Sequence, residues 1–183
     1  MTNDRVMKWD ELNILRREAV AFFSKKRKKE DIDHFLDYMD YILCLIYWQG
    51  WKDAETVVGI VQKTDGLDDI TVNQTIDGKT FRDRVTEDTT PDEAIRLIDT
   101  EAHRDYNTGV YDAAATSGKQ GIRKRWNTML DDRVRDPHAY MEGMVVGLDD
   151  EFYTYTGDHA KYPGGFGVPD LDINCRCWIT LQA

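Results

Sequence analysis

Two stretches of helical periodicity open the chain. In the first, apolar side chains recur every three or four residues from Trp9 to Phe22, and the pattern fades in the basic run from Lys25 to Lys29. In the second, apolar side chains recur in the same way from Ile32 to Ile46, and carboxylates lie in its first turns, where they suit the positive end of a helix dipole. The two patterns predict an antiparallel helical hairpin over residues 1–63.

A polar segment follows the hairpin. Residues 64–89 are rich in aspartate, threonine and glycine and show no helical period, so they are predicted to form a linker or an irregular crossover. A strong helix start comes next, because Thr90 can cap the helix, Pro91 suits its first position and Glu93 stands where a capping box places its acid. Gly118 is a natural stop, so one long helix is predicted before it.

The period changes from helical to alternating beyond Gly121. Ile122, Trp126 and Leu130 fall on one side of this stretch and polar residues on the other, which is typical of a half-buried strand. The short apolar pieces MVVGL, FYTYT and CWITL follow between glycines. The pattern as a whole predicts an α+β protein, with an N-terminal helical hairpin and then a long helix packed on a small irregular β-domain over residues 90–183.

Charge limits the function classes. The 183 residues include 24 basic and 34 acidic side chains, and the net charge of −10 argues against a general nucleic-acid coat, which needs a basic footprint. Two local basic clusters stay open as DNA contacts. They are Lys25, Lys26, Arg27, Lys28 and Lys29, and then Arg123, Lys124 and Arg125. The alternative interpretation of the first cluster is a solvated helix end, because cations stabilise a helix C-terminus.

Targeting signals and disulfides are not expected. The first ten residues are polar and no apolar signal region follows them. The longest apolar run, Tyr41 to Trp51, is far shorter than the roughly 20 residues that span a bilayer. Three cysteines are an odd number, which argues against a disulfide framework and favours an intracellular, reduced protein.

The densest group of polar residues lies between Trp126 and Gly143. It contains Asp131, Asp132, Arg133, Arg135 and His138. Three interpretations stay open. His138 is a general base oriented by one of the two aspartates, or a metal ligand that joins Cys175 and Cys177, or part of a polar turn held by Asp–Arg pairs.

The two C-terminal cysteines are separated by one residue. If this segment is a strand, Cys175 and Cys177 share one face, whereas a disulfide between them would close a very tight ring. With His138 they would supply three ligands for a tetrahedral zinc ion. The candidate fourth ligands are Asp131, Asp132 and His159. The alternative is a pair of small buried side chains packed beneath Trp126.

Established catalytic motifs are absent from the sequence. It contains no P-loop, no nucleophile elbow, no H-E-x-x-H helix and no dinucleotide fingerprint. A nucleophilic Cys175 or Cys177 would need an adjacent base and an oxyanion hole, and the glycines of Pro163–Gly167 more often only allow a loop to turn. These observations argue against an enzyme.

Three segments in order carry a family resemblance. They are DTEAHRDYNTGVYDAA from Asp99, RWNTMLDDRVRDPHAYMEGMVV from Arg125, and PGGFG followed by NCRC, which ends at Cys177. This combination resembles the Mu F-like head-morphogenesis family of tailed bacteriophages, also called minor head or minor capsid proteins. The residues carried over, as a structural or metal-organising core of a module over residues 90–183, are Glu101, Asn107, Trp126, Asp131, Asp132, Arg133, Arg135, His138, Asn174, Cys175, Arg176 and Cys177.

The resemblance implies a virion protein present in few copies. It would lie in the virion interior near the portal vertex, and in the host cytoplasm during assembly. Its partners would be the portal protein, other head proteins and packaged DNA, and it would act in head morphogenesis and in DNA retention or ejection. Longer relatives carry a toxin or ADP-ribosyltransferase domain after this module, and this chain stops at Ala183, so a structural protein is expected.

Two alternatives of other classes are kept. One is a metal-dependent hydrolase or nuclease centred on His138 with Cys175 and Cys177. It predicts turnover that chelation and His138→Ala both abolish. The other is a toxin or immunity-type partner whose acidic surface contacts a basic protein.

Overall fold

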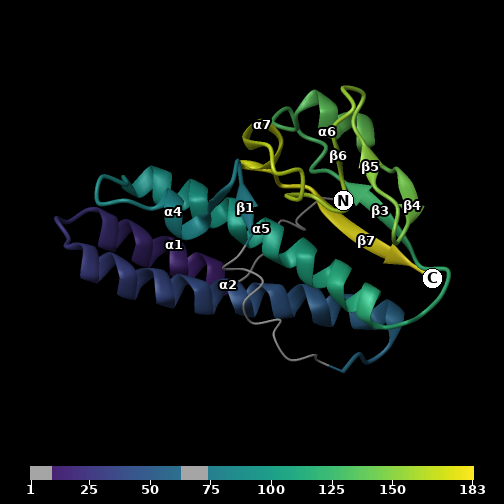
Figure 1. Ribbon diagram of the computed structural model, residues 1–183, viewed down its shortest axis with the longest axis horizontal. Helices are drawn as coiled ribbons and strands as arrows, with labels where there is room; N and C mark the ends of the chain where they lie inside the picture. Colours follow the sequence, from purple (N-terminus) through teal and green to yellow (C-terminus); the bar gives the residue numbers. More distant parts are fainter. Residues whose placement is uncertain (1–9, 63–73) are drawn as a thin grey trace.

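The computed structural model describes residues 10–62 and 74–183 and confirms an α+β fold (Figure 1). Residues 1–9 and 63 of the predicted hairpin, Trp9 among them, and residues 64–73 of the predicted linker lie outside this description. The helices are α1 (Asp10–Phe23), α2 (Lys29–Val58), α4 (Phe81–Arg84), α5 (Pro91–Thr116), α6 (Asp136–Met141) and α7 (Pro169–Asp172). Within the described ranges, no helix has the length and apolar content that a bilayer span requires.

The three long helices form one layer. The predicted hairpin is present as α1 and α2, and α5 packs along α2 and against α1 (Figure 1). The apolar stripes of the three helices meet in a common core, with Leu15, Met39, Ile98 and Ala102 fully buried. Burial of these stripes, more than intrinsic helix propensity, stabilises helices of this kind.

The start of α5 confirms the predicted capping box. The Thr90 hydroxyl accepts a hydrogen bond from the Glu93 amide at 3.3 Å, and the Glu93 carboxylate accepts one from the Thr90 amide at 2.8 Å. Pro91 stands in the first turn, where its missing N–H costs nothing. The turn between α1 and α2 is tied to this point, because the Arg27 guanidinium donates to the Thr89 carbonyl.

The closest helix contact is the crossing of α2 and α5. A Cβ atom added at Gly50 would lie 2.1 Å from the Tyr106 carbonyl oxygen, and one added at Gly109 would lie 2.0 Å from the Tyr47 carbonyl oxygen. The contact is therefore backbone against backbone in both directions. Only glycine permits this approach, because real Cβ atoms do not come so close to another heavy atom.

The described part of the predicted linker is ordered. Residues 74–89 form a two-stranded antiparallel hairpin, β1 (Thr75–Ile76) and β2 (Lys79–Thr80), followed by α4. Phe81 and Val85 pack into the core of the long helices. This segment is an irregular crossover that contributes to the core, and the predicted domain boundaries at 63 and 90 stay predictions.

The C-terminal region is the small irregular β-structure that the alternation predicts. Its strands are β3 (Arg123–Asn127), β4 (Val145–Gly147), β5 (Phe152–Tyr153), β6 (His159–Ala160) and β7 (Trp178–Gln182). The antiparallel order β4–β3–β7 makes one sheet, and β5 pairs with β6 in another. The fully buried Trp126 stands opposite Ile179 in the β3–β7 register.

Two residues of the predicted strand differ from expectation. Leu130, expected on the buried side, is 68% exposed with φ of 55°, because β3 ends at Asn127 and the alternation ends with it. Lys124, expected among the DNA contacts, shares the face of Trp126 and is fully buried. Its ammonium donates to the Leu148 carbonyl at 2.7 Å, and burial lowers its pKa to about 8. Lys124 is therefore removed from the set of surface contacts.

A buried charged cluster lies on α5. The Glu101 carboxylate accepts hydrogen bonds from Arg84 and Arg104, and all three side chains are largely shielded from solvent. Next to them, Asp105 is fully buried, and neither of its oxygens has a hydrogen-bond partner within the described ranges. Burial, together with the nearby Glu101 carboxylate, raises the pKa of Asp105 well above its usual range.

We expect Asp105→Asn to raise the free energy of unfolding at pH 8 by about 1–3 kcal/mol. The unfolded carboxyl ionises near pH 4, whereas the folded one keeps its proton to higher pH. The wild type therefore loses stability as pH rises above about 4, and the asparagine variant does not share this loss. Urea unfolding at pH 5 and pH 8 measures the difference, which should be larger at pH 8.

The control for this prediction is Asp132→Asn, which makes the same chemical change at an exposed site. It should change stability by less than about 0.5 kcal/mol at either pH. A loss of stability in Asp105→Asn at pH 8 would mean that the carboxylate is paired, and would contradict a buried carboxyl group whose pKa is raised.

Candidate metal centre

The structure brings together the three predicted ligands. His138 lies on α6, and Cys175 and Cys177 lie just before β7. The His138 Nδ1 atom is 3.6 Å from the Cys175 sulfur and 3.5 Å from the Cys177 sulfur, and the three donor atoms lie within 4.8 Å of one another. All three side chains are at least 96% buried, since their exposed fractions are 2%, 4% and 3%.

Local backbone geometry explains how they meet. The cysteines were expected on the last strand, but β7 begins only at Trp178, so both precede it. Asn174 has φ of 58°, a left-handed conformation, and so turns the chain into this segment. On the other side, the Arg135 guanidinium donates to the Ile173 carbonyl and ties the start of α6 to the cysteine segment.

The distances match those of a tetrahedral zinc site. With Zn–N of about 2.0 Å and Zn–S of about 2.3 Å, a tetrahedral angle places nitrogen and sulfur about 3.5 Å apart. The observed separations of 3.5 and 3.6 Å agree with that value. One imidazole and two thiols are also a donor set that zinc prefers.

The predicted fourth ligands lie elsewhere. Asp131 is held by Arg176 at 2.7 and 2.8 Å, His159 contacts Glu151 at 2.7 Å, and Asp132 is exposed. The potential metal group found among the described residues contains only the histidine and the two cysteines. None of the three predicted candidates therefore belongs to this group, because Asp131 and His159 are held by other partners and Asp132 is exposed.

The two thiols shift one another's pKa in opposite directions. The Cys177 thiol, and after it His138, lower the pKa of Cys175, against the effect of burial. The Cys175 sulfur and burial in turn raise the pKa of Cys177. A thiolate hydrogen-bonded to a thiol is a group whose proton a metal cation can replace, because metal ligation requires deprotonated sulfur.

An aromatic wall surrounds the group. The His138 ring stacks on Phe166 with centroids 5.6 Å apart and an interplanar angle of 16°, and Trp126 meets it edge-on at 5.7 Å. The His138 Nε2 atom is buried without a hydrogen-bond partner among the described residues. No carboxylate orients this imidazole there, so the geometry does not support a general base assisted by Asp131 or Asp132.

Asn107 joins the helices to the cysteine segment. Its amide nitrogen donates to the Cys177 carbonyl at 3.1 Å, and its oxygen accepts from the Ile179 amide at 2.9 Å. One side chain thus forms hydrogen bonds with the backbone at the unpaired edge of β7, as a neighbouring strand would. A second hydrogen bond links α5 to this segment, since the backbone N–H of Asn174 donates to the Thr100 hydroxyl at 3.0 Å.

The other residues predicted for the core of this module differ in how they are placed. Asp131 and Arg176 form a bidentate ion pair, and the hydrogen bond from Arg176 is the main cause that lowers the pKa of Asp131 to about 2. Arg133 is exposed, as is Asp132, and Glu101 belongs to the buried cluster of the helix layer instead. The polar-turn interpretation therefore applies to Asp131, whereas for the sulfur group the metal interpretation stays a prediction.

Two buried residues that hold the backbone near this centre had no predicted role. Thr100 is buried and receives the Asn174 amide, and the buried Asp172 accepts hydrogen bonds from the Phe166, Gly167 and Val168 amides. Burial raises the pKa of Asp172 to about 6, although the first two amides act in the opposite direction. Its position in the first turn after Pro169 was the available signal for a loop anchor.

The two predicted DNA-contact clusters lie at opposite ends of the molecule. Lys25 to Lys28 lie in the turn between α1 and α2 and Lys29 begins α2, whereas Arg123 and Arg125 lie on β3 (Figure 1). Arg123 is exposed, and the Arg125 guanidinium lies 3.5 Å from the Glu142 carboxylate. The two clusters therefore do not form one continuous basic surface.

Comparisons with known proteins place this geometry in a family. The chain is 36% identical over 87 residues to NAD(+)–arginine ADP-ribosyltransferase EFV of Enterococcus faecalis (strain ATCC 700802 / V583), which covers 46% of this chain and 18% of that enzyme. It is 33% identical over 79 residues to Minor head protein GP7 of Bacillus phage SPP1, which covers 43% of this chain and 26% of that protein. No solved structure matches it.

The matched segments thus span about a quarter or less of these two relatives. The family described as phage Mu protein F like protein matches residues 70–180. That range is more than half of the chain, and it contains α5, β3, β4, the first part of β7 and all three residues of the sulfur group. The chain therefore belongs to the phage Mu protein F like family.

Proposed function

We propose that this chain is a bacteriophage minor head protein that associates with the portal and other head proteins inside the virion. In this role it acts in head morphogenesis and in the retention or ejection of DNA. The observation that carries the proposal is the family match over residues 70–180, and the similarity to the SPP1 minor head protein supports it. The exposed Arg123 on β3, together with Lys28 and Lys29 at the start of α2, are the proposed sites of contact with packaged DNA.

ADP-ribosyl transfer is not proposed for this chain. The shared segment covers only 18% of the Enterococcus enzyme, so its similarity argues for a shared module. Hydrolysis is not favoured either, because His138 has no orienting carboxylate among the described residues and its Nδ1 atom faces two sulfurs.

The test is quantitative mass spectrometry of procapsids and mature virions from the phage that encodes this chain. We expect the chain in both particles, in fewer copies than the major capsid protein and in proportion to the portal protein. Particles assembled without the portal should lack it. Finding the chain abundant in infected cells and absent from both particles would overturn the proposal.

We further propose that His138, Cys175 and Cys177 hold a structural zinc ion. When bound, zinc would supply a cross-link between α6 and the segment before β7. The protein residues provide the rest, since Trp126 and Phe166 exclude water and Asn107 fixes the backbone of Cys177.

A further inference from the structure

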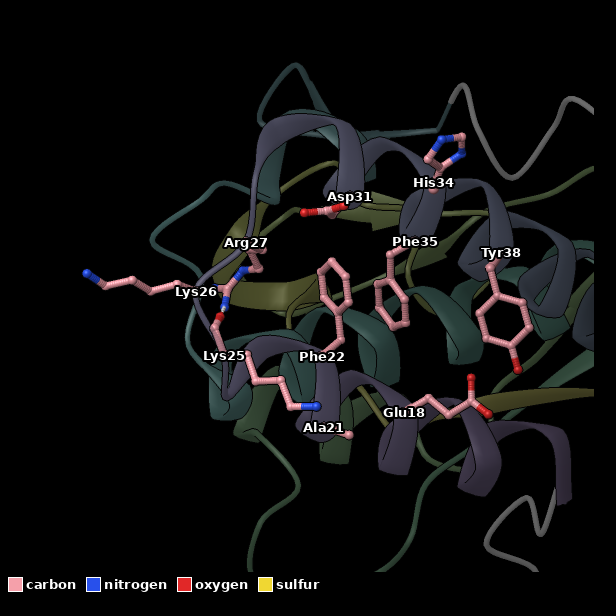
Figure 2. A pocket seen from close by; sticks show the side chains of 10 residues that line it. All are labelled: Glu18, Ala21, Phe22, Lys25, Lys26, Arg27, Asp31, His34, Phe35 and Tyr38. Atoms are coloured by element: carbon pink, nitrogen blue, oxygen red, sulfur yellow. Dashed lines mark hydrogen bonds between the residues drawn. The ribbon is translucent and has the colours of Figure 1, made fainter.

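An open groove lies at the end of the helical hairpin, far from the sulfur group. It has a volume of about 620 Å³ and lies between the last turns of α1 and the first turns of α2 (Figure 2). Phe22 and Phe35 form its apolar floor, stacked with centroids 4.3 Å apart and an interplanar angle of 6°. Phe23 packs against both rings from the buried side.

The acidic and guanidinium groups around this groove have partners within the chain. The Glu18 carboxylate lies beside the Tyr38 hydroxyl (Figure 2). Asp31 caps α2 by accepting the Lys28 amide at 3.0 Å. Arg27 donates to the Phe23 carbonyl, at 2.8 Å, and to two further backbone carbonyls. These groups are therefore not available to balance a charged ligand.

Lys25 and Lys26 are different. Both are exposed, and neither ammonium has a salt bridge to a carboxylate in the described part of the chain. Lys25 runs along the groove beneath Phe22, and Lys26 extends outward from its rim (Figure 2). The charged groups of this groove that can bind a partner are therefore positive, although the net charge of the chain is −10.

We propose that this groove binds an acidic segment of another protein, which packs an aromatic or aliphatic side chain on Phe22 and Phe35 and places carboxylates beside Lys25 and Lys26. An apolar floor with an uncommitted cationic rim is complementary to such a segment. DNA fits less well, because the two rings are already stacked on each other and leave no gap for a base, and because the chain as a whole repels phosphate. This proposal does not depend on the virion role.

The experiment is selection of a random peptide display library on the full chain, followed by fluorescence polarisation with the selected peptides. A labelled short DNA duplex is titrated in parallel at several salt concentrations. The key variant is Lys25→Glu/Lys26→Glu. Its matched control is Lys28→Glu/Lys29→Glu, which makes the same change of net charge at exposed residues of the same run that do not line the groove. Circular dichroism checks that both variants are folded, and Lys25→Gln/Lys26→Gln provides a milder substitution.

We expect the library to yield acidic peptides with an aromatic or aliphatic anchor. Their binding should weaken by at least about tenfold in Lys25→Glu/Lys26→Glu and by less than about twofold in the control. Equal weakening in the two pairs, selected peptides without acidic residues, or tighter and strongly salt-dependent binding of the duplex would each overturn the proposal. So would self-association of the chain that the first pair alone abolishes, since the occupant would then be a second copy.

Discussion

Gly109→Ala is expected to destabilise the protein by about 3–5 kcal/mol. The added methyl group would lie 2.0 Å from the Tyr47 carbonyl oxygen, and the neighbour is backbone of α2, so no side chain can move out of the way. The two helices must separate, which opens gaps between the buried stripes that they share. Urea unfolding followed by circular dichroism measures the loss.

The control is Gly118→Ala, where the same substitution meets no atom within 4 Å and only the φ of 67° is strained. It should cost about 1 kcal/mol. Gly50→Ala should match Gly109→Ala, and the double variant should cost less than the sum, because the first methyl group already separates the helices. A Gly109→Ala protein as stable as the control would contradict the close crossing.

The sequence predicted the helices of this layer but not their crossing. Apolar periodicity reports which face of each helix is buried, and the stripes from Ile32 to Ile46 and along α5 are buried as expected. A single glycine within a helical pattern, by contrast, indicates only that the helix propensity of the segment is lower. The meaning of Gly50 depends on Gly109 in another helix, and that pairing is a property of the tertiary structure.

The same distinction applies to the β-region. Alternation correctly predicted the strand around Trp126, but it could not report where the strand ends or that a lysine would be buried beside the tryptophan. Lys124 is accommodated because the Leu148 carbonyl and the Tyr111 ring, whose centroid lies 4.9 Å from its ammonium, replace part of its hydration. These partners come from distant segments, so the local alternation of apolar and polar residues cannot predict them.

The candidate site was predicted in part for a similar reason. The spacing of Cys175 and Cys177 indicates two sulfurs on one side of an extended chain, and His138 was a candidate by residue type. Whether a carboxylate joins them depends on the other partners that compete for it. Arg176 binds Asp131 in a bidentate pair, so Asp131 is not available to the sulfur group. The two residues are far apart in the sequence, and the local pattern does not predict that they pair.

The second large effect expected is the response of the protein to zinc. Protein purified without chelator should contain one zinc ion per chain, and metal at about 1,000 times its Kd should add about 4 kcal/mol of stability. For a chain of 183 residues this corresponds to a rise in Tm of about 8–16 °C over the chelated protein. Elemental analysis and thermal unfolding with and without chelator measure the two quantities.

Cys44→Ser is the matched control for Cys175→Ser and Cys177→Ser, because Cys44 is on α2 and outside the group of potential ligands. It should keep both the metal and the response to chelator, whereas the other two variants should lose both. Zinc binding should also release protons and weaken as pH falls, since the two sulfurs must be deprotonated. If the parent protein holds no zinc and its Tm is unchanged by added metal, the three side chains form a packed, hydrogen-bonded group without metal.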